Sequence, residues 1–175
     1  MKRVCPEELC ERILARYACY YDIDRAPELF GENPAAKAEF HSRGEKYFLV
    51  RRAKIWAMEC NEIVFLFRER ELTPERVEQL SAFMRKCEPV FVKPHNEHMY
   101  TYLTLLIAAE RVLPEAERAV RRLHFTKNYK CGLYGYSTLQ AAVFDCEKRS
   151  VRYNRAGRAL RGTFRKVYPQ DEQSC

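Results

Sequence analysis

The sequence lacks any uninterrupted apolar run of about eighteen residues, the length that a membrane-spanning helix needs. Its first residues, MKRVCPEELCERI, carry charges but no apolar segment of the kind found in secretory signals. These two absences argue against a membrane partner and predict a cytoplasmic protein.

The eight cysteines lack the spacing of a metal or redox motif. No two of them are separated by two residues, which argues against a zinc ribbon and a thioredoxin-like pair. Because the spacing is scattered and no secretory signal is present, we expect free thiols that serve mostly as small apolar residues. The cysteines are Cys5, Cys10, Cys19, Cys60, Cys87, Cys131, Cys146 and Cys175.

Several sequence signatures of enzymes and repeat proteins are also missing. The chain contains no Glu-x-Lys or Asp-x-Lys, the pair that one class of metal-dependent nucleases needs. Asp145, Glu147 and Lys148 have suitable side chains at the wrong spacing. Gly132 and Gly135 precede a strand pattern, whereas a phosphate-binding loop opens a helix. No repeat and no long linker divides the 175 residues, so we expect one globular domain over 1–168 and a flexible tail over 169–175.

The local patterns predict alternating helices and strands. Proline or a capping threonine precedes three apolar stripes of helical period, which predicts helices at 6–21, 74–87 and from Pro114. Short runs of aromatic and β-branched residues predict strands, and Asn61-Glu62 lies at a plausible tight turn between two of them. The predicted strands are 47–50, 53–60, 62–67, 100–109, 130–145 (long or broken) and 151–153, with a short helix at 159–167.

This order of elements predicts an α+β fold, with a mostly antiparallel or mixed sheet and three to four helices packed on one face. The run from Tyr100 to Ala109 contains no charge, so we take it as the central strand, buried on both faces. The three most apolar strand-like runs predict the core residues Val64, Leu66, Leu103, Leu105, Ile107 and Val143.

A pair of histidines precedes the central strand. His95 and His98 are three residues apart with Glu97 between them, and imidazole and carboxylate groups suit a divalent metal such as zinc. The two-histidine spacing of zinc proteases is absent, and the sequence does not place a fourth ligand among His41, His124, Asp145 or a cysteine. The alternative is a polar loop whose histidines bind backbone or water.

The C-terminal region carries arginines at every third position, which are Arg149, Arg152, Arg155, Arg158 and Arg161. Tyr153 and Phe164 are interleaved with them, and guanidinium groups beside aromatic rings suit phosphates and unstacked bases. The net charge of +7 is compatible with an anionic partner. The alternative is a solvated face paired with glutamates.

Three segments resemble a small family of uncharacterised bacterial proteins of about this length. They are PHNEHM at 94–99, GLYGYS at 132–137 and YNRAG at 153–157. The resemblance covers most of the chain from Tyr47 to Gly157. It implies a complete, free-standing protein and assigns no activity, so it transfers no catalytic or binding residue.

Two functions follow as hypotheses. The first is a non-catalytic binding or regulatory module without a cofactor, whose basic C-terminal region contacts nucleic acid or an acidic protein. The second is a small metal-dependent hydrolase that uses His95, Glu97 and His98. The sequence favours the first because the second has no complete ligand set, and it leaves open whether the protein is an enzyme.

Overall fold

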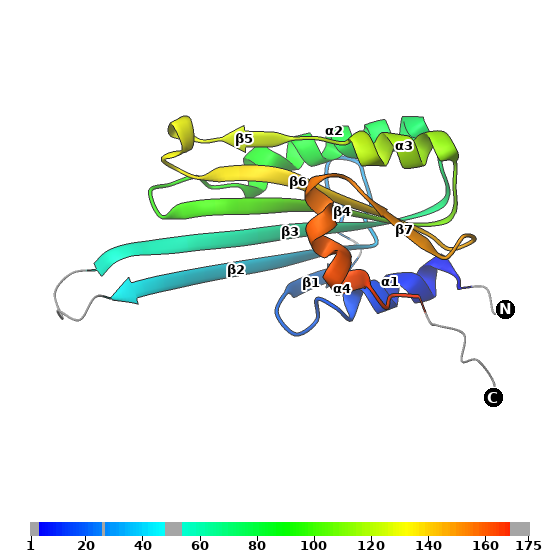
Figure 1. Ribbon diagram of the computed structural model, residues 1–175, viewed down its shortest axis with the longest axis horizontal. Coiled ribbons are helices and arrows are strands. Elements are labelled where there is room, and N and C mark those ends of the chain that lie inside the picture. The colour runs from blue at the N-terminus through cyan, green and yellow to red at the C-terminus, as the bar shows by residue number, and fades with distance from the viewer. Residues whose placement is uncertain (1–3, 26, 48–53, 169–175) are drawn as a thin grey trace.

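A computed structural model describes residues 4–25, 27–47 and 54–168 (Figure 1). Its helices are α1 (Pro6–Leu14), α2 (Pro74–Phe91), α3 (Pro114–Arg122) and α4 (Arg161–Phe164), together with the short 3-10 helices η1 (Lys130–Gly132) and η2 (Ala156–Leu160). Its strands are β1 (Asp22–Arg25), β2 (Ala36–Tyr47), β3 (Lys54–Leu72), β4 (His98–Val112), β5 (Thr126–Asn128), β6 (Tyr136–Asp145) and β7 (Ser150–Tyr153).

The described strands form one mixed sheet in the order β1-β2-β3-β4-β6-β5, and β7 pairs with the C-terminal half of β6. The pairs β1–β2 and β2–β3 are antiparallel, whereas β3–β4 and β4–β6 are parallel, and both β5 and β7 pair antiparallel with β6. The parallel pairs follow from the crossovers, because α2 between β3 and β4, and α3 with β5 between β4 and β6, return the chain to the end of the sheet at which the preceding strand began. The predicted α+β fold with a mixed sheet is therefore confirmed.

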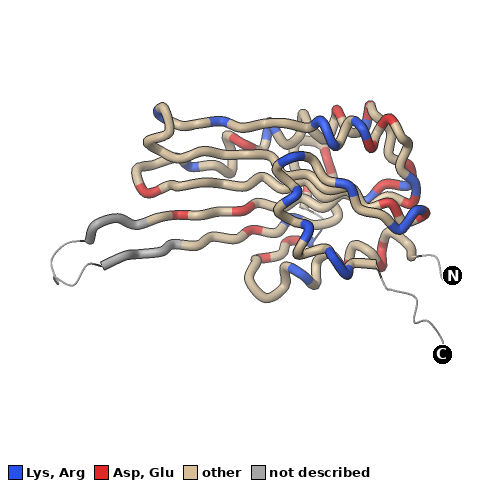
Figure 2. Tube along the Cα trace, in the orientation of Figure 1, with Lys and Arg blue, Asp and Glu red and all other residues tan. Residues whose placement is uncertain are grey.

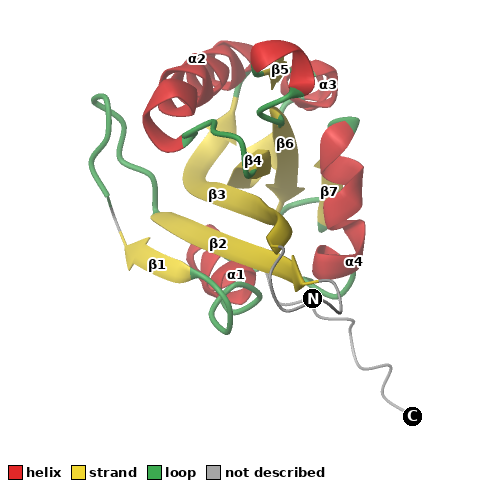
Figure 3. Cartoon of the chain, turned by 90° about the vertical axis from the view of Figure 1, so that its left-hand side faces the viewer, coloured by secondary structure: helices red, strands yellow, loops and turns green. Residues whose placement is uncertain are grey.

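Helices cover both faces of the sheet, which Figure 3 shows from one end. Helices α2 and α3 pack on one face, and α1, η2 and α4 pack on the other; we call these the α2 face and the α1 face. The prediction that all helices pack on one face is wrong. Neighbouring residues of a strand point to opposite faces, and both Leu105 and Leu106 are fully buried. Each face of the sheet therefore needs its own layer of helices to bury its apolar side chains.

The predicted turn at Asn61-Glu62 does not exist. Both residues lie inside β3 and pair with β2, Asn61 opposite His41 and Glu62 opposite Phe40. Tight hairpin turns favour a glycine, which this pair lacks. Apolar residues typical of a strand continue on both sides of the pair. One long strand thus replaces the two predicted strands. Of the predicted strand 47–50, Tyr47 ends β2, and 48–50 lie outside the described residues, as does the predicted tail at 169–175.

The helix starts match the sequence signals. The Thr73 hydroxyl accepts a hydrogen bond from the Arg76 amide at 3.3 Å, and Pro74 opens α2. Helix α1 also begins at its proline but ends at Leu14, earlier than predicted, and turns continue through Tyr20.

The predicted strand 130–145 is broken near its start. Lys130 and Cys131 adopt the left-handed backbone region with φ of 45° and 53°, and Gly132 follows at 90°. Strand β6 therefore begins only at Tyr136.

The predicted core is confirmed, because its six residues are each at most 2% exposed. The seven described cysteines form no disulfide bond with one another. In the described part of the chain, no helix combines the length and the apolar character needed to cross a membrane.

Candidate functional site

Five polar side chains meet on the α2 face, where β4 and β6 begin. They are Glu88, His98, Thr101, Tyr129 and Ser137, and we call them the His98 cluster. All five are at most 9% exposed. The Tyr129 hydroxyl donates to Glu88 and lies 2.8 Å from the Ser137 hydroxyl, which links two sides of the cluster. Buried polar groups that are hydrogen-bonded in this way stabilise a single arrangement of the surrounding chain.

His98 uses both of its ring nitrogens within the protein. Its Nδ1 lies 2.7 Å from the Tyr134 carbonyl, and its Nε2 lies 2.9 Å from the Thr101 hydroxyl. A carbonyl oxygen only accepts, so Nδ1 carries the hydrogen and Nε2 is left to accept from Thr101. The imidazole therefore has no unused lone pair for a metal ion.

Glu88 is a buried carboxylate near the C-terminal end of α2, where the helix dipole disfavours negative charge. The ammonium of Lys127, 3.0 Å away, and the hydroxyl of Tyr129 compensate for this position. Burial, followed by the hydrogen bond to Glu88, raises the pKa of Tyr129 above its ordinary value. This part of the cluster is thus also internally satisfied.

The other residues of the predicted metal site have separate partners. His95 Nε2 lies 2.7 Å from a Glu59 oxygen, and His95 Nδ1 accepts from the Glu97 amide at 3.2 Å. The rings of His95 and His98 are 6.3 Å apart between centroids. Asp145 lies at the opposite end of β6 beside Lys148. Within residues 4–25, 27–47 and 54–168, no three His, Cys, Asp or Glu side chains form a group suited to a metal ion.

The three segments that carried the family resemblance have structural roles. Gly135 lies so close to the start of β4 that a Cβ there would stand 2.2 Å from the Met99 carbonyl and 2.6 Å from that of His98. Its φ of 70° also favours glycine. The segments 94–99 and 132–137 therefore pack directly on each other, and the His98–Tyr134 hydrogen bond joins them.

The third segment anchors the C-terminal region to β6. The Asn154 side chain, 1% exposed, accepts from the amides of Ala141 and Gly157 at 2.9 and 2.6 Å. Its amide group donates to the carbonyls of Leu123 and Leu139. A Cβ at position 157 would stand 2.4 Å from the Ala141 carbonyl, so only glycine permits this approach. These contacts place η2 and α4 firmly against the α1 face.

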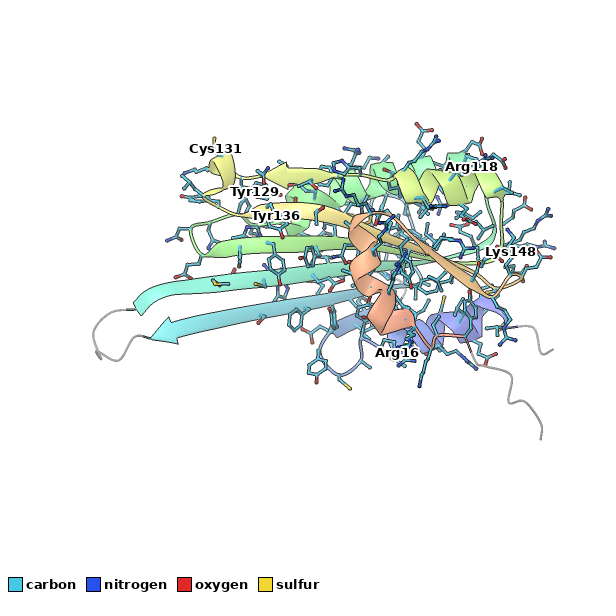
Figure 4. The ribbon with its side chains drawn as sticks, viewed as in Figure 1. Arg16, Arg118, Tyr129, Cys131, Tyr136 and Lys148 are labelled. Atoms are coloured by element: carbon cyan, nitrogen blue, oxygen red, sulfur yellow. The ribbon has the colours of Figure 1, made fainter. Side chains whose placement is uncertain are left out.

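The predicted row of arginines does not share one surface. Arg149 follows β6 in a tight turn with φ of 50°, and Arg152 forms an ion pair with Glu117 of α3 at 3.0 Å. Arg155, Arg158 and Arg161 are exposed on the segment that contains η2 and α4. Figure 2 shows basic positions along this segment, which we call the basic segment (155–166). Arg16 of the turn after α1 joins it by donating to the Lys166 carbonyl at 3.3 Å (Figure 4).

Half of the α1 face has no helix over it among the described residues, as Figure 1 shows to the left of α4. The strand register places aromatic and polar side chains there in two rows across the sheet. One row is Cys60, Tyr100 and Tyr136, and the next is Phe40, Glu62, Tyr102 and Thr138. All of these side chains are partly exposed, and Tyr21 lies beside them. We call this set of eight residues the tyrosine face.

The rings of the tyrosine face contact each other. Tyr100 and Tyr102 stack with centroids 4.6 Å apart and planes at 28°, and Tyr136 lies 6.0 Å from Tyr100. A hydrogen bond with Cys60 and then burial raise the pKa of Tyr100 to about 12. Burial and a hydrogen bond with Tyr136 raise the pKa of Tyr102 above its ordinary value. These contacts hold the rings in place while leaving them partly open to solvent.

Glu62 lies in the middle of the tyrosine face. Its two oxygens accept hydrogen bonds from the hydroxyls of Tyr21 and Thr104, each at 2.6 Å. Burial, and then this hydrogen bond to Glu62, raise the pKa of Tyr21. The neighbouring Tyr17 hydroxyl is buried and has no hydrogen-bond partner within the described residues. Glu62 is thus a fixed carboxylate among aromatic rings.

The prediction that strand 100–109 is buried on both faces is wrong for Tyr100 and Tyr102, which are partly exposed on the tyrosine face. A signal was nevertheless present: Tyr100, Tyr102 and Thr104 alternate with apolar or small residues, and so do Tyr136, Thr138 and Gln140. Alternation of this kind marks a strand with one face that is not part of the apolar core.

The fold and the site together define an open-sheet α+β domain with helices on both faces and an uncovered, tyrosine-rich half of one face. The chain belongs to a family described as a domain of unknown function, DUF8052, which matches residues 6–166. Membership confirms the resemblance to an uncharacterised family, while the bacterial origin stays a prediction. Neither the curated proteins nor the solved structures contain a match to the chain.

Proposed function

We propose that this protein binds nucleic acid through its basic segment, without a catalytic step. The observation that carries the proposal is the environment of Arg155, Arg158 and Arg161. All three are exposed, and among the described residues no acidic side chain lies within ion-pair distance of them. Arginines already paired with carboxylates, such as Arg152, are less available to phosphates.

The fixed backbone that carries these arginines also supports the proposal. Asn154 and Gly157 hold η2 against β6, so the arginines project from a fixed support and lose less entropy on binding. The Arg161 guanidinium lies 6.0 Å from the centre of the Tyr153 ring. An arginine beside an aromatic ring suits a nucleic acid better than an acidic protein, because it offers contacts to phosphates and to bases. No contact in the described chain favours the alternative, a metal-dependent hydrolase.

Binding should be measured by fluorescence anisotropy with labelled RNA and DNA oligonucleotides, each at several salt concentrations between about 50 and 200 mM. Three phosphate contacts to a single strand predict a log–log slope of about −2, at about −0.7 per contact. Arg155→Ala, Arg158→Ala and Arg161→Ala should each reduce the slope by about 0.7, because each removes one phosphate contact.

Arg118→Ala and Arg121→Ala provide matched controls. Both residues lie on α3, which packs on the opposite face, and Arg118 pairs with Glu115. If these variants weaken binding as much as Arg158→Ala, the attraction is diffuse and the proposed site is wrong. If polyglutamate binds as tightly as the oligonucleotides, the partner is an acidic protein. If no oligonucleotide binds at about 50 mM salt, nucleic-acid binding is excluded.

A further inference from the structure

We infer that the ligand is single-stranded nucleic acid and that its unpaired bases stack on the tyrosine face beside the basic segment. This inference rests on the proposed function and specifies its substrate class. The tyrosine face supplies aromatic surface for bases, and the basic segment supplies cations for the phosphates that connect those bases.

The first argument is the geometry of the rings. Tyr100 and Tyr102 of β4 stack on each other with centroids 4.6 Å apart, and Tyr136 of β6 lies 6.0 Å from Tyr100, so the three rings form one aromatic cluster. All three rings are partly exposed. Bases stack on aromatic rings regardless of sequence, because every base has a π-face. A double helix keeps its bases stacked within the duplex, so its bases cannot stack on these rings.

The second argument is the position of negative charge. Glu62 is held among the rings by two hydrogen bonds, and a carboxylate there repels phosphates from the middle of the tyrosine face. Its oxygens keep unused lone pairs, which accept hydrogen bonds from base amino groups. Phosphates are thus directed towards the basic segment, and bases towards the rings.

The third argument is that the basic segment and the tyrosine face are neighbours on the α1 face. Buried aromatic contacts join α4 to Tyr21 of the tyrosine face, because Tyr17 lies 6.1 Å from Phe164 and 4.7 Å from Tyr21 between ring centroids. Arg161, at the start of α4, covers Tyr153. The basic segment is therefore close enough to the tyrosine face for one nucleic-acid strand to contact both.

A shallow pocket extends the tyrosine face beyond the start of β4. It has a volume of about 320 Å³ and is lined by residues that include Met58, Met99, Leu133 and Tyr136. This volume is at the lower end of the range for small-ligand pockets. The pocket therefore has room for one further base next to the Tyr136 ring.

The experiment compares tyrosine variants on a single-stranded oligonucleotide of roughly 12 nucleotides that contains 2-aminopurine. Tyr100→Leu and Tyr136→Leu should each weaken binding about 5- to 150-fold, the loss expected when one stacked base loses its ring. The salt slope should stay unchanged, because no phosphate contact is removed. Tyr100→Phe keeps the aromatic ring and should retain most of the affinity.

Tyr134→Leu is the matched control, because this partly exposed tyrosine packs against the core of the opposite face. Stacking on the wild-type protein should also change the 2-aminopurine fluorescence on binding, which tests the inference without a variant. Thermal unfolding of every variant verifies that the protein is folded.

The outcomes separate this inference from the proposed function. If the arginine variants weaken binding while the tyrosine variants do not, and a duplex of equal length binds equally well, base stacking is wrong and the proposed function stands. If the 2-aminopurine signal does not change on binding, the inference is likewise wrong. If nothing binds at about 50 mM salt, both fail.

Discussion

The His98 cluster and the tyrosine face lie on opposite sides of the same two strands and differ in how their polar groups are satisfied. Thr101 points into the cluster and is 1% exposed, whereas its neighbours Tyr100 and Tyr102 point to the other face and are partly exposed. In the His98 cluster, both ring nitrogens of His98 form hydrogen bonds, one with the Tyr134 carbonyl and one with the Thr101 hydroxyl. In the tyrosine face, the rings are held by their neighbours but not covered by a described helix. The cluster therefore has the character of a structural element, and the tyrosine face that of a binding surface.

Residue type alone is therefore a poor guide to function. Two histidines and a glutamate near one another indicate a metal site by composition, yet His98 is bound to Tyr134 and Thr101, and His95 to Glu59. Tyrosines in a strand indicate only a pleated surface by composition. Which of the two regions remains open to a ligand depends on where the helices end.

The largest change in stability is expected in the two hydrophobic cores, outside the His98 cluster and the tyrosine face. It tests whether the two faces of the sheet are equally well packed. Leu105 belongs to the core of the α2 face and Leu106 to that of the α1 face, and both are fully buried. Leu105→Ala and Leu106→Ala should each lower the free energy of unfolding by about 2–5 kcal/mol, measured by denaturant titration. A loss below about 0.5 kcal/mol for either residue would contradict its assignment to the core.

A smaller effect tests the comparison directly. His98→Ala leaves the Tyr134 carbonyl and the Thr101 hydroxyl without their partner, which should cost at least about 1–3 kcal/mol of unfolding free energy. Tyr100→Leu should cost less than about 1 kcal/mol, because the ring is partly exposed and belongs to neither hydrophobic core. If Tyr100→Leu destabilises the protein as much as His98→Ala, the tyrosine face is a structural element and its role in binding is doubtful.

The smallest expected effect is a change in the alkylation rate of one cysteine, measured on the folded wild-type protein. Cys60 is partly exposed on the tyrosine face, and Cys131 is exposed on η1. A bound single strand should slow alkylation of Cys60 several-fold and leave Cys131 unaffected, as followed by peptide mass spectrometry. Equal rates at Cys60 with and without oligonucleotide would place the ligand elsewhere.

The buried cysteines provide the reference for that measurement. Burial raises the pKa of Cys10 to about 11 and those of Cys87 and Cys146 to about 12. Because the thiolate is the reactive form, these three should react slowly at pH 8 in either state. After denaturation without a reductant, thiol titration should find all eight cysteines of the sequence.

Local signals in the sequence determined the helix starts and the apolar strands. Pro6, Pro74 and Pro114 open the three main helices, and the predicted core residues are buried. These features depend on neighbouring residues and on the periods of helix and strand, so they can be read from the chain itself. The single long strand β3 was not predictable in this way, because Asn61-Glu62 has the composition of a turn.

The contacts between residues far apart in the sequence are visible only in the folded chain. His98 bonds to Tyr134 across 36 positions, and Asn154 joins β6 to the carbonyl of Leu123, 31 positions away. The early end of α1 and the position of α4 then determine which half of the α1 face stays open. Such contacts depend on how strands pair and on which side of the sheet each helix packs. Residue spacing along the chain carries little information about either.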